Sequence, residues 1–282
     1  MGSEWERAYC HWYAKTQYSG EGELVEVGSW LGHFALALAR GLEESTDGRT
    51  ALRGVHTFEL FEWEEWMNVS VERTDLENRY RSGDNFRAGF EEQVAPVRAR
   101  VVVHEGDLST LGWPGGSIEF LLVDAMKTFS LSNTILRSFF GHLVPGRSVV
   151  MHQDFCHWWT SWIHPVMYRL REYFEPVYDV PHSASVVFRL RRSLPESCLK
   201  QYGWDDFSPA ELDAAFTYSE SIVGEESRAM VTAARVASLG HRGKVEEAWA
   251  QFHSRLNGVE GQAADEARQL GQWLTRLSAP SA

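Results

Sequence analysis

Short apolar runs alternate with helix-forming stretches through the first two thirds of the chain. Strands are predicted where apolar and β-branched residues run together, at 24–27, 54–61, 101–104, 118–123, 148–152 and 185–191. A mostly apolar run such as 118–123 is typical of a parallel strand that is covered on both faces. Helices are predicted between the strands, at 34–42, 62–93, 131–143 and 162–174. This alternation predicts an α/β fold with a doubly wound, mostly parallel sheet.

The tail differs in character from the rest of the chain. From about Ser208 it is rich in Ala, Glu, Arg and Gln and has no strand pattern, and residues 208–211 have the form of a helix capping box. Three or four helices are expected there. The predicted organisation is a helical segment at 1–22, an α/β domain at 23–195 and a helical C-terminal region at 205–282, which is also a candidate arm for a homodimer.

Composition and charge narrow the range of partners. Lys and Arg number 27 against 39 Asp and Glu, so the formal charge is −12 and nucleic acid is an unfavourable partner. No basic cluster, signal peptide or membrane-spanning apolar run is present, and three cysteines without metal-type spacing fit a reducing compartment. A cytoplasmic protein that acts on a small molecule, away from membranes, is expected.

The most informative segment joins the first predicted strand to a helix. Its strand carries Glu26 near the end, and Gly28, Ser29 and Gly32 then form a Gly-x-x-x-Gly turn. Glycines allow a ligand to approach the backbone closely, and the helix that follows presents free N–H groups. The turn lacks the Gly-x-Gly-x-x-Gly of dinucleotide sites and the Lys-Ser/Thr of phosphate loops, so it favours a nucleoside-like ligand without phosphate.

Acidic residues follow the other predicted strands. Glu59 ends the second strand 31 residues after Gly28, where an acid in such folds binds ribose hydroxyls. Asp107 and Leu108 follow the third strand, and Asp124 follows the fourth. Because the carboxyl ends of parallel strands face one crevice, these residues are expected to surround one ligand.

These motifs resemble those of class I S-adenosylmethionine-dependent methyltransferases, which have a Rossmann-like fold, over roughly residues 23–190. The segment Asp124-Ala125-Met126-Lys127 resembles the Asp-x-x-Lys motif of catechol O-methyltransferases. The segment from Pro145 to Phe155 is similar to the corresponding stretch of the macrocin O-methyltransferase and cephalosporin hydroxylase group. The resemblance implies that S-adenosylmethionine is the cofactor, and that Glu26, Gly28, Ser29, Gly32, Glu59, Asp107, Leu108 and Asp124 bind it.

The same resemblance implies catalytic and metal-binding roles further along the chain. Asp124 and Asp154 are the expected ligands of Mg²⁺ or Mn²⁺, and Lys127 or His152 is the expected base that removes a proton from an acceptor hydroxyl. Asp154 would also hold that hydroxyl through the metal. The sequence departs from both templates, because Phe155 stands where the catechol-type enzymes have Asn and no Asp-Gly-Asp stretch is present.

Three alternatives stay open at this point. His152, His157 and His164 lie among Trp158, Trp159 and Trp162, which predicts either a lid over the substrate or a buried aromatic corner. A metal-dependent hydroxylase or other redox enzyme on the same scaffold would use His152, Asp154 and His157 as ligands. A non-catalytic binding module would use the helical tail as its working surface.

Overall fold

The computed structural model describes residues 2–48 and 53–279. Contacts within the chain divide it into two compact units, Met1–Asp124 and Ala125–Ala282. The division falls inside the predicted α/β domain, directly after Asp124.

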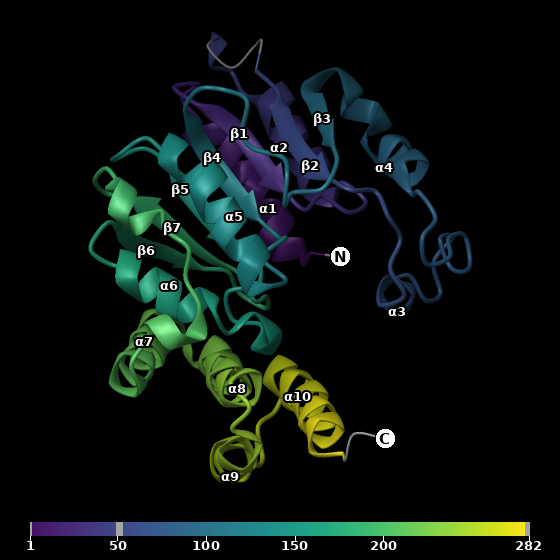
Figure 1. The fold of residues 1–282 in the computed structure, drawn as a ribbon. Coiled ribbons are helices and arrows are strands. Elements are labelled where there is room, and N and C mark those ends of the chain that lie inside the picture. The colour runs from purple at the N-terminus through teal and green to yellow at the C-terminus, as the bar shows by residue number, and fades with distance from the viewer. Residues whose placement is uncertain (1, 49–52, 280–282) are drawn as a thin grey trace. The chain divides into compact units, whose positions relative to one another are not determined.

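Seven strands form one sheet with the hydrogen-bonded order β3-β2-β1-β4-β5-β7-β6 (Figure 1). Their bounds are β1 Glu23–Val27, β2 Val55–Glu59, β3 Val101–Glu105, β4 Ile118–Val123, β5 Val149–His152, β6 Phe174–Asp179 and β7 Val186–Leu190. β1 is parallel to β2 and β4, and β2 is parallel to β3, whereas β7 is antiparallel to β5 and β6. The Rossmann-like, mostly parallel sheet predicted from the sequence is confirmed.

In the first unit, helices pack on the parallel strands. The helices are α1 Glu4–Trp12, α2 His33–Glu44, α3 Met67–Ser70 and α4 Arg87–Val94. A capping box starts α1, because the Ser3 side chain accepts from the N–H of Glu6 while the Glu6 carboxylate accepts from the N–H of Ser3. α2 lies against β1 and β2 and buries Leu38 and Leu42, which stand four residues apart on one face.

One predicted helix of this unit is wrong. A helix was expected over residues 62–93, interrupted by a loop near residues 82–84. A turn is present at 82–83, but residues 62–86 form turns around the single-turn helix α3, and only α4 is a regular helix. The two ends of the segment are joined by hydrogen bonds from the N–H of Trp63 to the carbonyl of Asp84 and from the N–H of Gly83 to the carbonyl of Trp63.

The second unit contains the antiparallel strands and the helical tail. Its helices are α5 Phe129–Phe139, α6 Ile163–Leu170, α7 Pro209–Ile222, α8 Glu225–His241, α9 Val245–Arg255 and α10 Gln262–Ser278. The four tail helices agree with the three or four expected, and Ser208 caps α7 by accepting from the N–H of Glu211. In the part of the chain that the structure describes, none of the helices has the length and apolar character needed to cross a membrane.

The tryptophans that follow β5 belong to the interior of the second unit. Trp158 is 6% exposed and lies in a core formed with apolar residues of α8, α9 and α10. Its ring centroid is 5.4 Å from that of Trp273, and its backbone N–H donates to the carboxylate of Glu266 at 2.8 Å. Trp162 is 4% exposed. For Trp158 and Trp162 the structure agrees with the buried aromatic corner, whereas Trp159 and His157 are partly exposed and the lid stays a prediction for them.

Candidate functional site

The turn after β1 adopts a backbone that its glycines make possible. Gly28 and Gly32 have φ angles of 86° and 78°, and the N–H of Gly32 donates to the carbonyl of Ser29 at 2.7 Å. A Cβ at Gly32 would lie 2.8 Å from the Phe90 ring, so α4 packs directly against this backbone. Trp30 between the glycines also has a positive φ, 41°, which is unusual for a bulky residue. The turn is thus a tightly fixed loop.

Strand register brings the acidic positions of the first unit to one edge. Val27 at the end of β1 is aligned with Phe58 of β2 and with Val123 of β4. Glu59 is aligned with Glu105 at the end of β3. Gly28, Glu59, Gly106 and Asp124 therefore follow their strands at the same edge, as expected for the ligand crevice of an open α/β sheet.

Glu59 is tied to the glycine turn. Its carboxylate accepts hydrogen bonds from the backbone N–H groups of Trp30 at 2.7 Å and of Leu60 at 3.0 Å. Burial raises the pKa of Glu59, and these N–H groups oppose that rise. Because an ionised carboxylate can accept about four hydrogen bonds, Glu59 keeps capacity for hydroxyl groups of a ligand.

Glu26 is a buried carboxylate that makes no hydrogen bond of normal geometry among the described residues, although the Ser29 hydroxyl and the N–H of Ala35 lie near enough to oppose the rise of its pKa. Its side chain is completely buried, and neither oxygen has a hydrogen-bond partner among the described residues. The hydroxyls of Ser29 and Thr57 are likewise buried and without partners there. Burial and the negative charge of Asp124 raise the pKa of Glu26 well above its ordinary value. Unsatisfied polar groups of this kind are rare in folded proteins and point to a missing ligand or ion.

Asp107 is exposed, whereas Leu108 is buried. The Asp107 carboxylate is exposed and accepts from the N–H of Ser109 at 2.7 Å, which caps its own turn and lowers its pKa. Leu108 is 8% exposed and belongs to the core. The N–H of Gly106 donates to the carbonyl of Glu59, so this turn is fixed beside the end of β2. Contact between Asp107 and an adenine amino group stays a prediction.

In the second unit, Lys127 and Asp154 form an ion pair. Burial opposes ionisation of Asp154, but Lys127 and His157 outweigh it and hold the pKa of Asp154 below its ordinary value. An ammonium paired with a carboxylate is stabilised in its charged form, which does not suit the role of base predicted for Lys127. The pair also occupies the carboxylate that was predicted to bind a metal ion.

His152 lies in the aromatic core of the second unit. It is 1% exposed, its ring centroid lies 5.9 Å from that of Phe188, and neither ring nitrogen has a hydrogen-bond partner among the described residues. Burial lowers its pKa to about 3. These surroundings give His152 no access to a substrate, so its predicted role as a base has no support from its position.

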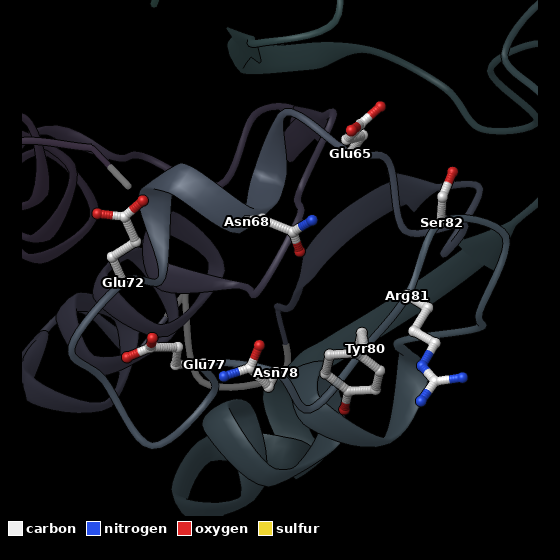
Figure 2. Close-up of a pocket in the computed structure, with 8 residues that line it drawn as sticks. All are labelled: Glu65, Asn68, Glu72, Glu77, Asn78, Tyr80, Arg81 and Ser82. Atoms are coloured by element: carbon white, nitrogen blue, oxygen red, sulfur yellow. The ribbon is translucent and has the colours of Figure 1, made fainter.

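Two further observations concern ligands. Within 2–48 and 53–279, no group of three or more His, Cys, Asp or Glu side chains is arranged to hold a metal ion. A cavity of about 670 Å³ in the turn-rich segment after β2 is lined by Glu65, Asn68, Glu72, Glu77, Asn78, Tyr80, Arg81 and Ser82 (Figure 2). It contains none of the residues predicted to bind the cofactor, so it is separate from the strand edge.

Sequence reasoning missed the part that Trp30 plays. Its N–H holds Glu59 against the glycine turn, its ring lies 6.0 Å from that of Trp66, and its indole nitrogen is buried without a partner among the described residues. A bulky residue between two turn glycines was the signal available in the sequence.

Proteins similar to this chain are found among solved structures. No protein family and no curated protein matches the sequence. Among solved structures, the chain is similar to CalS11, a TDP-rhamnose 3'-O-methyltransferase of calicheamicin biosynthesis, with a TM-score of 0.45 and 16% identity over 66% of this chain and 78% of that one. It is also similar to an S-adenosylmethionine-dependent O-methyltransferase from Thermotoga maritima (TM-score 0.38, 14% identity, 69% of this chain, 68% of that one).

A third similar structure extends over nearly the whole chain. It is the 23S rRNA methyltransferase ErmE, with a TM-score of 0.38 and 15% identity over 98% of each chain. The chain is thus similar to methyltransferases of solved structure, at identities that leave its own activity to be inferred from its residues.

Proposed function

We propose that this chain is an S-adenosylmethionine-dependent methyltransferase that methylates a hydroxyl group of a small molecule. The observation that carries the proposal is the Glu26 carboxylate, fully buried below the glycine turn without a hydrogen bond of normal geometry among the described residues. An ionised carboxylate in such a place is unfavourable unless a cationic group reaches it. The ammonium group of S-adenosylmethionine is such a group.

The rest of the edge fits the same cofactor. Glu59 keeps hydrogen-bonding capacity for the two ribose hydroxyls while it binds the N–H of Trp30. The buried Ser29 hydroxyl can donate to the carboxylate of the methionyl group. Glu26, Glu59 and Asp124 together make the edge acidic, which suits a cationic ligand without phosphate. When bound, the cofactor supplies an electrophilic methyl group on a sulfonium.

The groups for the acceptor hydroxyl follow directly in the chain. Lys127 and Asp154 both belong to the second unit, where they form an ion pair. Paired with Asp154, Lys127 keeps its proton and is suited to stabilise negative charge that develops on the acceptor oxygen. Asp154, an acceptor when ionised, is the group of this pair that can accept a hydrogen bond from the hydroxyl and orient it.

The hydroxylase alternative has less support. It needs two histidines and a carboxylate around an open coordination site. His152 is buried among phenylalanines, and Asp154 is paired with Lys127. Titration in the presence of added Mg²⁺ or Mn²⁺ tests whether a divalent cation assists methyl transfer.

Calorimetric titration with S-adenosylmethionine tests the proposal. We expect the unmodified chain to bind it, and Glu26→Gln to bind it at least tenfold more weakly, because a charge-assisted hydrogen bond is lost. Gln has nearly the shape of a protonated Glu, so this variant should fold. Glu43→Gln, at an exposed position of α2, is the matched control and should bind normally. Glu59→Ala should also weaken binding at least tenfold.

The pH dependence gives a second readout. The pKa of Glu26 is raised in the ligand-free chain, and a bound ammonium favours the ionised carboxylate. Binding should therefore release a proton, and affinity should rise with pH through the range in which Glu26 ionises. Titrations in buffers of different ionisation enthalpy measure that proton, which should vanish in Glu26→Gln. Absence of binding with and without Mg²⁺ or Mn²⁺ would overturn the proposal and favour a binding module.

A further inference from the structure

A second cavity of the first unit lies between two helices, and none of the residues proposed for the cofactor lines it. α1 packs against α2 (Figure 1). The groove between the two helices has a volume of about 700 Å³. Each helix contributes side chains spaced at i, i+3, i+4 and i+7, at positions 4, 7, 8 and 11 of α1 and 33, 36, 37 and 40 of α2. This spacing places each set on a single helix face, so one face of α1 and one face of α2 line the groove.

The groove is basic in a chain that is acidic overall. The permanently charged side chains that line it are Arg7 and Arg40, against the single carboxylate of Glu4, and His11 and His33 also line it. The whole chain carries a formal charge of −12, so a local excess of cationic side chains stands out from its surroundings.

The two arginines of the groove are not neutralised by carboxylates. The Arg7 guanidinium donates to the backbone carbonyl of Gly2, and no carboxylate of the described residues forms an ion pair with Arg7 or Arg40. His33 lies close enough to feel this charge, because burial and Arg7 together lower its pKa. At the far end of the groove His11 approaches Glu44, with 3.2 Å between Nε2 and Oε2.

We propose that this groove binds a small molecule carrying a phosphate or diphosphate group. The planar guanidinium of arginine matches phosphate oxygens in pairs, and two such groups suit a ligand with two or more negative charges. Ala8, Leu36 and Ala37 provide an apolar surface between them for the rest of the ligand. The volume falls within the range of small-molecule sites, and the acidic chain as a whole disfavours a nucleic acid.

Calorimetric titration of the full chain with pyrophosphate tests this site, with inorganic phosphate and citrate as comparison anions at one ionic strength. Pyrophosphate should bind most tightly. Arg40→Gln should weaken its binding about tenfold, because one charge-assisted contact is lost. Arg40 is exposed and has no ion-pair partner among the described residues, so the variant should fold normally. Arg7→Gln should have a similar effect.

The control is Arg276→Gln, which removes an equally exposed arginine from α10 and should leave pyrophosphate binding unchanged. Binding of S-adenosylmethionine should be the same in Arg40→Gln and the unmodified chain, which separates this site from the proposed cofactor site. No binding of pyrophosphate, equal losses in Arg40→Gln and Arg276→Gln, or citrate binding as tight as pyrophosphate would each overturn the proposal.

Discussion

Two buried carboxylates in neighbouring strands have opposite surroundings. Glu26 of β1 has no hydrogen-bond partner among the described residues, whereas Glu119 of β4 accepts from the backbone N–H groups of Ser19, Glu21 and Gly22 and from the Ser19 hydroxyl. Both are completely buried. Glu119 therefore fixes the loop before β1 to β4, while Glu26 is left to meet a ligand.

Glu119→Ala should lower the free energy of unfolding by about 3 kcal/mol or more, because it leaves buried N–H groups of Ser19 and Gly22 without an acceptor. Urea unfolding measures the loss. Glu43→Ala, at an exposed position of α2, should change the free energy of unfolding by less than about 0.5 kcal/mol. Similar values for both variants would show that Glu119 does not hold the loop.

The role of Glu26 could be predicted from the sequence, whereas the role of Glu119 could not. Glu26 and Glu59 were identified because each stands near the end of a strand that its neighbours predict. The partners of Glu119 lie about 100 residues earlier in the chain, at Ser19 and Gly22, and no local pattern records that pairing. Position along a strand is readable from sequence, whereas a hydrogen-bond partner brought in by the fold is not.

Among the elements, the glycine turn and α2 depend on close packing against α4. Gly32 combines a φ of 78° with Phe90 and Val94 atoms 2.8 and 2.9 Å from the place a Cβ would take. Gly32→Ala should cost about 2 kcal/mol of unfolding free energy, because an L residue is strained at this φ and the methyl group would push against α4. The displaced turn should also bind S-adenosylmethionine more weakly.

Thermal and urea unfolding measure the first effect, and calorimetric titration measures the second. Gly48→Ala is the control, because a Cβ there would have no atom within 4 Å. If Gly32→Ala were as stable as Gly48→Ala, the turn would tolerate a side chain and would not be fixed by its packing.

Elements were predictable where their pattern was local. The strand that became β4 was clear because all six of its residues are buried. β6 was not expected, because Phe174–Asp179 is a polar edge strand that contains Pro176, which edge positions tolerate. The helix expected at 62–86 failed for a related reason, since charged residues that suit a helix surface also suit exposed turns. The tryptophans at 158–162 signalled burial without indicating that the tail helices cover them.

At the scale of the whole molecule, the predicted residues divide between the two units. Those proposed for the cofactor, from Glu26 to Asp124, belong to the first unit, and Lys127 and Asp154 belong to the second. Within the second unit the tail turns its apolar side chains onto Trp158, so α8 and α10 are part of that unit's core. A homodimer formed through the tail stays a prediction, which light scattering checks.

The second unit also sets how the protein responds to acid. His152 and His164 are almost completely buried, their ring nitrogens have no partners among the described residues, and burial lowers the pKa of each to about 3. In the unfolded chain their pKa is about 6.5. Above that pH both histidines are neutral in the folded and in the unfolded chain, so they do not make the stability depend on pH. Below it the unfolded chain gains protons that the folded chain cannot, so stability falls with pH between about 6.5 and 3.

Below about pH 6.5, each histidine should lower the free energy of unfolding by about 1.4 kcal/mol per pH unit. Urea unfolding at pH 7.5, 6.5 and 5.5 measures the loss, which should be small in the first step and steep in the second. His164→Phe removes one titrating ring from an aromatic neighbourhood that includes Phe155 and Phe216, so it should make the second step shallower. His253→Gln, at an exposed position of α9, should leave the dependence unchanged. If His164→Phe lost stability equally steeply, groups other than His164 would cause the acid sensitivity, because a phenylalanine ring cannot be protonated.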